Sequence, residues 1–253
     1  MEKRKELIYR VRPINQNTLD EITTPYLWFS RPSGFKGDYF DANIQAFVED
    51  TKAIKNGIKH IIPEFPFEEW YNGIAKTGIC CFTQKMPRKN ALNRFPKCGG
   101  EKAICIEYDK NILTSFFENH SKHPLYPCFH KIEYANNPTK LEVCDDWSIL
   151  WSVENGYKEY RTLANILHSH PRELDSFILK LLTRLDAKHK HQKEERIILG
   201  GRNIPDLSPN LSGYKITIPM NTINKIFVYN NVPQPWIDEL MNTETICKKI
   251  EFI

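Results

Sequence analysis

The chain has 253 residues, seven cysteines and a formal net charge of +4. Hydrophobic residues make up 41% of it, enough for a core, which excludes a generally disordered protein. No apolar run approaches the roughly 20 residues of a membrane-spanning helix, so we expect no membrane partner. The cysteine count is odd, no pair has CxxC spacing, and no signal peptide opens the sequence. These features predict reduced thiols and a cytoplasmic location.

Short strands and short helices follow one another irregularly along the chain. Apolar and β-branched runs bounded by turn residues predict strands, and apolar residues at helical spacing predict helices. Strands are expected at residues 7–11, 26–30, 78–83, 102–108, 130–134, 195–199, 214–218, 223–229 and, as an edge strand, 245–252. Helices are expected at residues 15–22, 42–58, 65–75, 111–119 and 235–242.

This order of elements predicts an α+β fold in a single domain that covers residues 1–253. We expect a mostly antiparallel mixed sheet with short helices, because the strands do not alternate with long helices as in a doubly wound parallel sheet. Apolar residues recur at helical spacing between residues 163 and 185, interrupted at Pro171. They predict a helical insert at about residues 147–190.

The stretch from Lys188 to Leu199, KHKHQKEERIIL, passes from a charged run into a β-branched run that ends at two glycines. This pattern is typical of the beginning of a buried strand. Carboxylates at the mouth of a strand, beside cationic neighbours, can be held ionised and face a ligand. The alternative is a solvated loop whose charges only remain in water.

Several segments, taken in order along the chain, carry a family resemblance. They are Tyr9-Arg10, LWFSRPSGF with Asp38 and Asp41 behind it, Cys81-Phe82-Thr83, AICIEYD, KIEY, KHKHQKEERIIL and the tail KITIPMNTINKIFV. Together they resemble the bacterial family catalogued as domain of unknown function 2971. The chain departs from the family pattern in the loop at residues 36–41 and at residues 92–95. The family name itself implies no activity.

The order of elements also resembles the ADP-ribosyltransferase arrangement. In one class of those enzymes an Arg on the first strand grips NAD and a Ser on the second strand supports the nicotinamide ribose. A late strand carries Gln-x-Glu. The resemblance implies two groups of site residues. Those that bind NAD are Tyr9, Arg10, Asp38 and Arg196. Those that take part in catalysis are Ser30, Gln192 and Glu194.

The chemistry of this reaction suits these residue types. Breaking the nicotinamide–ribose bond builds positive charge on the sugar, and a fixed carboxylate such as that of Glu194 stabilises that charge. The planar donor fork of Arg10 fits a pyrophosphate. Gln192 would share a face with Glu194 if the strand began that early, because residues two apart on a strand point the same way. We therefore expect Glu194 to face Arg10 and Ser30, and Glu195 to point away.

The resemblance predicts an NAD-dependent, ADP-ribosyltransferase-like enzyme that modifies a nucleic acid or a protein, in the role of a bacterial toxin or phage-defence effector. An antitoxin or regulator is a further expected partner. NAD is expected as the substrate, and no metal ion is expected. The pattern His120-x-x-His123 with Cys128 and His130 has zinc-ligand types, but no matching second pair accompanies it.

Two other classes of function stay open. The chain is a nucleic-acid binding or processing module if its basic run at residues 184–202 contacts phosphates, through Lys188, Lys190, Lys193 and Arg202. It is a non-catalytic interaction protein if the helices expected at residues 147–190 form a docking surface.

Overall fold

The computed structural model describes residues 5–35, 77–88, 103–119, 128–136, 151–154, 157–160, 182–199, 212–229 and 232–253, and also residues 168, 169, 172, 179 and 180. Within these ranges the fold is α+β with a mostly antiparallel sheet, which confirms the predicted class. The helices expected at residues 42–58 and 65–75 lie outside the described residues. Asp38, His120, His123 and Arg202 lie outside them as well.

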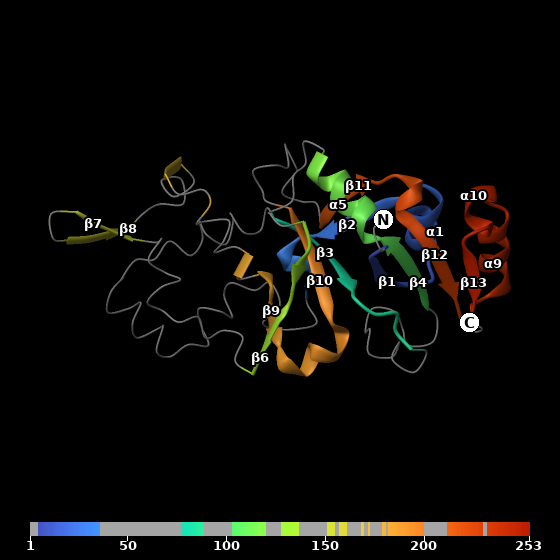
Figure 1. The fold of residues 1–253 in the computed structure, drawn as a ribbon, viewed down its shortest axis with the longest axis horizontal. Coiled ribbons are helices and arrows are strands. Elements are labelled where there is room, and N and C mark those ends of the chain that lie inside the picture. The colour runs from blue at the N-terminus through green and yellow to red at the C-terminus, as the bar shows by residue number, and fades with distance from the viewer. Residues whose placement is uncertain are drawn as a thin grey trace.

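A nine-stranded sheet runs through the described part of the chain (Figure 1). Its strands are β1 Leu7–Pro13, β2 Tyr26–Ser30, β3 Gly78–Thr83, β4 Ala103–Asp109, β5 His130–Lys131, β10 Glu194–Leu199, β11 Gly213–Thr217, β12 Ile223–Val228 and β13 Ile250–Phe252. They follow the order β11–β2–β3–β1–β4–β12–β13, and β10 pairs with both β3 and β5. Within this sheet β12 and β13 run parallel, and the other pairings described are antiparallel.

Short helices connect these strands. They are α1 Gln16–Thr23, η1 Pro32–Gly34, α5 Lys110–Asn119, η5 Ala187–Gln192, η7 Met220–Thr222, α9 Gln234–Met241 and α10 Glu244–Cys247. Asn15 caps α1, because its side chain accepts from the Thr18 N–H. None of the helices described here combines the length and apolarity that a membrane crossing requires.

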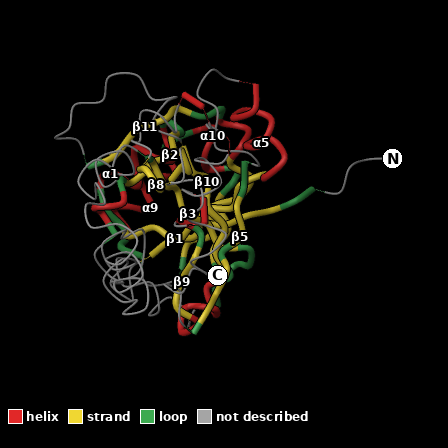
Figure 2. The backbone as a smooth tube through the Cα atoms, turned by 90° about the vertical axis from the view of Figure 1, so that its left-hand side faces the viewer, coloured by secondary structure: helices red, strands yellow, loops and turns green. Residues whose placement is uncertain are grey.

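The two faces of the sheet carry different side chains. The helix face bears the main core, in which strand residues pack against apolar residues of α1, α5, α9 and α10. Ile8, Phe82 and Ile106 belong to this core. The opposite face bears a smaller apolar cluster around Cys105 and Phe227. Figure 2 shows strands of the nine-stranded sheet near the middle of the view, with α1 and α9 on the left and α5 and α10 towards the top.

Strand β3 is the branch point of the sheet. One of its edges pairs with β10 along its whole length. Its other edge is shared, because Thr83 pairs with Tyr9 of β1 whereas Ile79 pairs with Ser30 of β2. Four residues separate the two positions on β3, so β1 and β2 meet it about 13 Å apart along the strand.

The strand expected at residues 130–134 is divided into two. The Ile132 N–H donates to the carbonyl of Glu194, whereas the Glu133 N–H donates to the carbonyl of Thr183. The chain therefore leaves the main sheet after β5 and forms β6, Glu133–Ala135, which pairs in parallel with β9, Arg184–Asp186.

The predictions for residues 147–190 and 245–252 are wrong in part. The first region contains an antiparallel hairpin of β7, Trp151–Glu154, and β8, Tyr157–Tyr160, where a helix is expected. Runs rich in aromatic residues favour strands, and the helical spacing of apolar residues begins only after this hairpin, at residue 163. The second region begins as α10, because the Thr243 carbonyl accepts from the N–H groups of Ile246 and Cys247. Only its end joins the sheet, as β13.

Candidate functional site

Three residues lie side by side on neighbouring strands, on the face of the sheet that is opposite to the helix face. Tyr9 of β1 pairs with Thr83 of β3, and Thr83 pairs with Glu194 of β10. Adjacent strands are about 4.8 Å apart, so Glu194 lies about 10 Å from Tyr9. We call Tyr9, Thr83 and Glu194 the central row. The central row brings together Tyr9 and Glu194, which are expected at the site, and Thr83, for which the sequence predicts no role.

The Glu194 carboxylate is held by Arg196, which lies two residues further along β10 and so points to the same face. The Arg196 Nε donates to Glu194 Oε1 at 2.5 Å. Arg196 also donates through Nη1 to the carbonyl of Leu182 at 2.7 Å, and its guanidinium carbon lies 5.4 Å from the Phe35 ring centroid. The Arg196 side chain is 0% exposed and that of Glu194 is 11% exposed. A guanidinium fixed by these contacts fixes the carboxylate, which still reaches the surface.

Hydrogen bonds from two other strands secure the start of β10. The Glu194 N–H donates to the Tyr134 hydroxyl oxygen at 2.7 Å. The Thr83 hydroxyl donates to the carbonyl of Gln192 at 2.6 Å. Between these bonds lies Lys193, whose backbone adopts the left-handed conformation with φ 46° and ψ 51°. Burial raises the pKa of Tyr134, which keeps its hydroxyl protonated.

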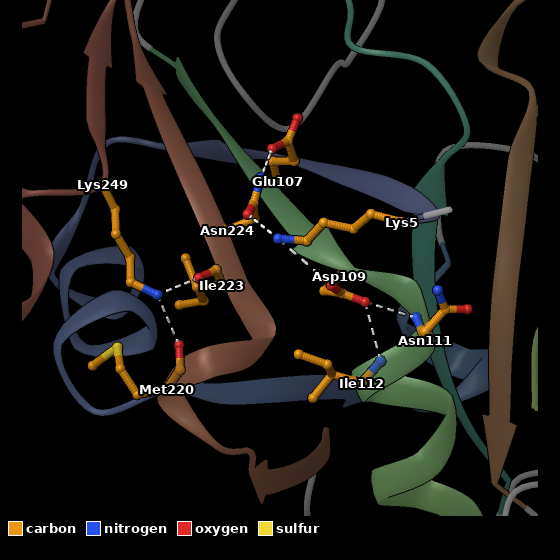
Figure 3. Close-up of polar contacts among 9 residues, drawn as sticks. All are labelled: Lys5, Glu107, Asp109, Asn111, Ile112, Met220, Ile223, Asn224 and Lys249. Carbon is orange, nitrogen blue, oxygen red and sulfur yellow. Dashed lines mark hydrogen bonds and ion pairs between the residues drawn. The ribbon is translucent and has the colours of Figure 1, made fainter. Parts of the chain in front are cut away.

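A polar network fixes the Tyr9 end of the central row. The Tyr9 hydroxyl hydrogen-bonds Glu107 of β4, and burial together with this carboxylate raises the pKa of Tyr9 to about 12. Asn224, at the register shift between β12 and β4, donates to Glu107. Figure 3 shows Asn224 also accepting from Lys5, which pairs with Asp109 at 3.6 Å. Glu107 is 5% exposed, so this carboxylate serves the network.

Arg10 lies on the helix face, opposite to Glu194. Its Nη1 donates to Glu21 Oε1 at 2.7 Å, and the Nε of Arg12 lies 2.7 Å from the other oxygen, Oε2. The Tyr108 hydroxyl donates to the same carboxylate at 3.1 Å. Arg10 is 7% exposed and Glu21 is 0% exposed. The expectation that Arg10 faces Glu194 is therefore wrong, because Glu21, a buried carboxylate of α1, holds the arginine on the helix face.

Ser30 and Gln192 do not join the central row. Ser30 pairs with Ile79, at the end of β3 remote from Thr83. Gln192 ends η5, and β10 begins only at Glu194, after the left-handed residue. The alternation of side chains along a strand therefore does not bring Gln192 beside Glu194.

Glu195 is the counterpart of Glu194 on the helix face. Its Oε2 lies 2.8 Å from the Nζ of Lys110, and its Oε1 accepts from the Gln84 side chain at 2.7 Å. The Glu195 side chain is only 3% exposed. Glu195 therefore acts as a buried anchor for α5, whereas Glu194 has partial access to solvent.

The segments that carry the family resemblance meet at this site. Phe35, Thr83 and Tyr134 come from LWFSRPSGF, Cys81-Phe82-Thr83 and KIEY, and they surround the pair of Glu194 and Arg196. Those three residues were missed because each segment on its own is an ordinary strand end or turn. The indication in the sequence that these residues belong to one site was that the three segments occur together in the chain. Arg196, which the resemblance placed among NAD-binding residues, is buried and positions Glu194.

Known proteins supply no assignment for this site. No family model, curated protein or solved structure matches the chain at a significant level. Among the described residues no three His, Cys, Asp or Glu side chains gather as metal ligands would. The geometry of the central row is therefore the basis for assigning a function.

Proposed function

We propose that the central row is the active site of an ADP-ribosyltransferase-like enzyme that uses NAD as its substrate and Glu194 as its catalytic carboxylate. The observation that supports this proposal is the contrast between Glu194 and Arg196. The arginine is wholly buried and fixes the carboxylate, while the carboxylate keeps 11% of its side chain exposed. A preorganised charge at the surface of a rigid strand suits the stabilisation of a cationic transition state.

The reaction breaks the bond between the nicotinamide nitrogen and the ribose C1′. The bonding electron pair leaves with neutral nicotinamide, and the positive charge develops on the ribose. Glu194 stabilises that charge, because a fixed carboxylate in a partly desolvated site needs little reorganisation. An oxygen or nitrogen nucleophile of a nucleic acid or protein acceptor then attacks C1′, and its proton passes to the solvent.

The remaining residues of the site act through Glu194 or beside it. Arg196 is a positioning residue, as are Tyr134 and Thr83, which secure the backbone on either side of Lys193. The backbone of Tyr9 lies about 10 Å from that of Glu194, and both side chains are on the same face of the sheet. Aromatic rings suit the planar bases of a dinucleotide, so we assign Tyr9 to substrate binding.

The test is the release of nicotinamide from NAD by the purified protein, measured with and without a mixture of nucleic acids or proteins as acceptor. We expect release by the native chain and a loss of at least about a hundredfold in Glu194→Gln, the scale on which single electrostatic groups contribute. Equal release by Glu194→Gln and the native chain would remove Glu194 from the mechanism.

A further inference from the structure

A run of exposed cations leads directly into the central row. Lys188 and Lys190 on η5 and Lys193 behind it are exposed. The turn that follows β3 lies alongside, because the Gln84 N–H donates to the carbonyl of Lys193. This turn adds the exposed Lys85. We call Lys85, Lys188, Lys190 and Lys193 the basic rim; in Figure 1 its η5 portion lies at the end of β10.

Among the residues that the structure describes, the carboxylates near the basic rim pair with Lys188 or with groups outside the rim, and not with Lys85, Lys190 or Lys193. Residues 187–193 contain no Asp or Glu. Asp186 caps η5 by accepting from the Lys188 N–H, and it lies 3.6 Å from the Lys188 Nζ. Glu194 is engaged by Arg196 and Glu195 by Lys110. The rim therefore presents a local positive potential beside the proposed catalytic carboxylate.

The backbone at Lys193 adds a second observation. A left-handed conformation at a residue other than Gly costs about 1 kcal/mol, and Gly or Asn would adopt it more easily. A lysine at this position retains a charge next to Glu194 in spite of that cost. Lys193 follows directly after η5, and its N–H donates to the carbonyl of Lys190 at 3.4 Å. The two lysines therefore lie at the same end of η5.

We infer that the basic rim binds the sugar-phosphate backbone of a nucleic acid and presents it to Glu194, so that the acceptor of the proposed reaction is a nucleic acid. A group of lysines beside a site suits the repeated phosphates of a nucleic acid, because contacts with phosphates depend on charge and little on sequence. The inference rests on the proposed function for the role of the nucleic acid as acceptor. The binding itself is independent of that function.

The experiment measures fluorescence anisotropy of a labelled 20-nucleotide single-stranded DNA, and of the RNA of the same sequence, between 50 and 200 mM salt. Three phosphate contacts give a slope of about −2 for log affinity against log salt, which is a loss of roughly 16-fold over this fourfold range of salt. The variant Lys188→Gln/Lys190→Gln/Lys193→Asn is expected to flatten the slope by about two. Asn at position 193 keeps the left-handed backbone accessible.

The matched control removes the same charge elsewhere. Lys215 on β11, Lys225 on β12 and Lys248, directly after α10, are exposed, and Figure 1 shows α10 remote from η5. The control variant Lys215→Gln/Lys225→Gln/Lys248→Gln is expected to bind with the native salt slope. Equal slopes for the two triple variants, or a flat salt dependence of the native chain, would overturn the inference. Displacement of the oligonucleotide by polyglutamate of equal charge would also overturn it, because the rim would then suit acidic proteins equally well.

This inference and the proposed function fail in different ways. Glu194→Gln retains the basic rim and loses one negative charge beside it, so it is expected to bind the oligonucleotides at least as tightly as the native chain. Native binding by a chain that releases no nicotinamide from NAD would contradict only the proposed function. Nicotinamide release by a chain that does not bind nucleic acid would contradict only the role of the basic rim.

Discussion

Glu194 and Glu195 are neighbours in the chain, yet their carboxylates lie on opposite faces of the sheet and have different partners. Glu194 is held by Arg196 on the face of Tyr9 and Thr83. Glu195 is held by Lys110 and Gln84 on the face that packs against the helices. One residue of register thus separates a carboxylate available for chemistry from one that anchors a helix.

The pair of Glu194 and Arg196 is expected to be energetically coupled. Arg196→Met removes a buried guanidinium and leaves Glu194 and the Leu182 carbonyl without it, so we expect a loss of about 2–4 kcal/mol in the free energy of unfolding. The double variant Glu194→Gln/Arg196→Met is expected to be more stable than the sum of the single effects predicts, by about 1–3 kcal/mol. Urea denaturation of the four proteins measures this coupling. Strict additivity would show that the two side chains do not depend on each other.

Arg10 is expected to serve stability, with no part in binding NAD. Arg10→Met leaves Glu21 with Arg12 and Tyr108, and Glu21→Gln leaves both arginines without their anion. We expect the second variant to be destabilised by about 3–5 kcal/mol, and the first by less.

A structural role of Arg10 also predicts that its substitution leaves the KM for NAD almost unchanged. For Arg10→Met, at a temperature where it is folded, KM for NAD should stay within about twofold of the native value. A large rise in KM with unchanged stability would show that Arg10 takes part in binding NAD.

The elements of the fold followed from local patterns, because strand and helix preferences are properties of short segments. β2, β3 and α1 appear where the sequence predicts them. The pairing of strands is different in kind. Nothing local shows that β3, rather than β2, lies between β1 and β10, because register depends on contacts between segments that are far apart in sequence.

The misplacement of Arg10 and Ser30 has this same origin. Both residues lie on the strands where they were expected. The side chain of Tyr9, and not that of Arg10, lies on the same face of the sheet as Glu194. Strand β2 pairs with the end of β3 that is remote from Glu194, so Ser30 lies far from Glu194 along the sheet. Residue types along a sequence identify the strands of a site, while the face and register of each strand are set by tertiary packing.

The raised pKa of Tyr9 predicts a dependence of stability on alkaline pH. Tyr9 remains neutral in the folded chain up to a pKa of about 12, whereas in the unfolded chain it ionises near its ordinary value of 10.0. Between these values the folded chain binds more protons than the unfolded one, so stability falls as pH rises. Tyr9→Phe removes this contribution, and its denaturation midpoint should decline less steeply than that of the native chain. Parallel pH profiles would contradict the burial of the Tyr9 hydroxyl against Glu107.

The left-handed backbone at residue 193 predicts that stability and nucleic-acid affinity change in opposite directions. Lys193→Gly relieves the conformational cost and should raise the free energy of unfolding by up to about 1 kcal/mol. The same substitution removes one phosphate contact and should reduce the salt slope of oligonucleotide binding by about 0.7. Thermal denaturation and anisotropy measure the two effects. Lys190→Gly serves as a comparison, because it removes a charge without relieving a left-handed residue. A stability gain with unaltered binding would exclude Lys193 from the contact surface.

The most direct measurement compares Glu194→Gln with Glu195→Gln in the release of nicotinamide from NAD, alongside their unfolding in urea. The proposed site predicts that Glu194→Gln loses activity by at least about a hundredfold while it is folded, with a loss of about 1–3 kcal/mol of stability because the buried Arg196 loses its anion. It predicts that Glu195→Gln loses about 1–3 kcal/mol of stability, because Lys110 and Gln84 lose their anion, and keeps its activity while folded. The reverse result, with activity lost in Glu195→Gln and retained in Glu194→Gln, would contradict the assignment of the active site to the face of Tyr9 and Thr83.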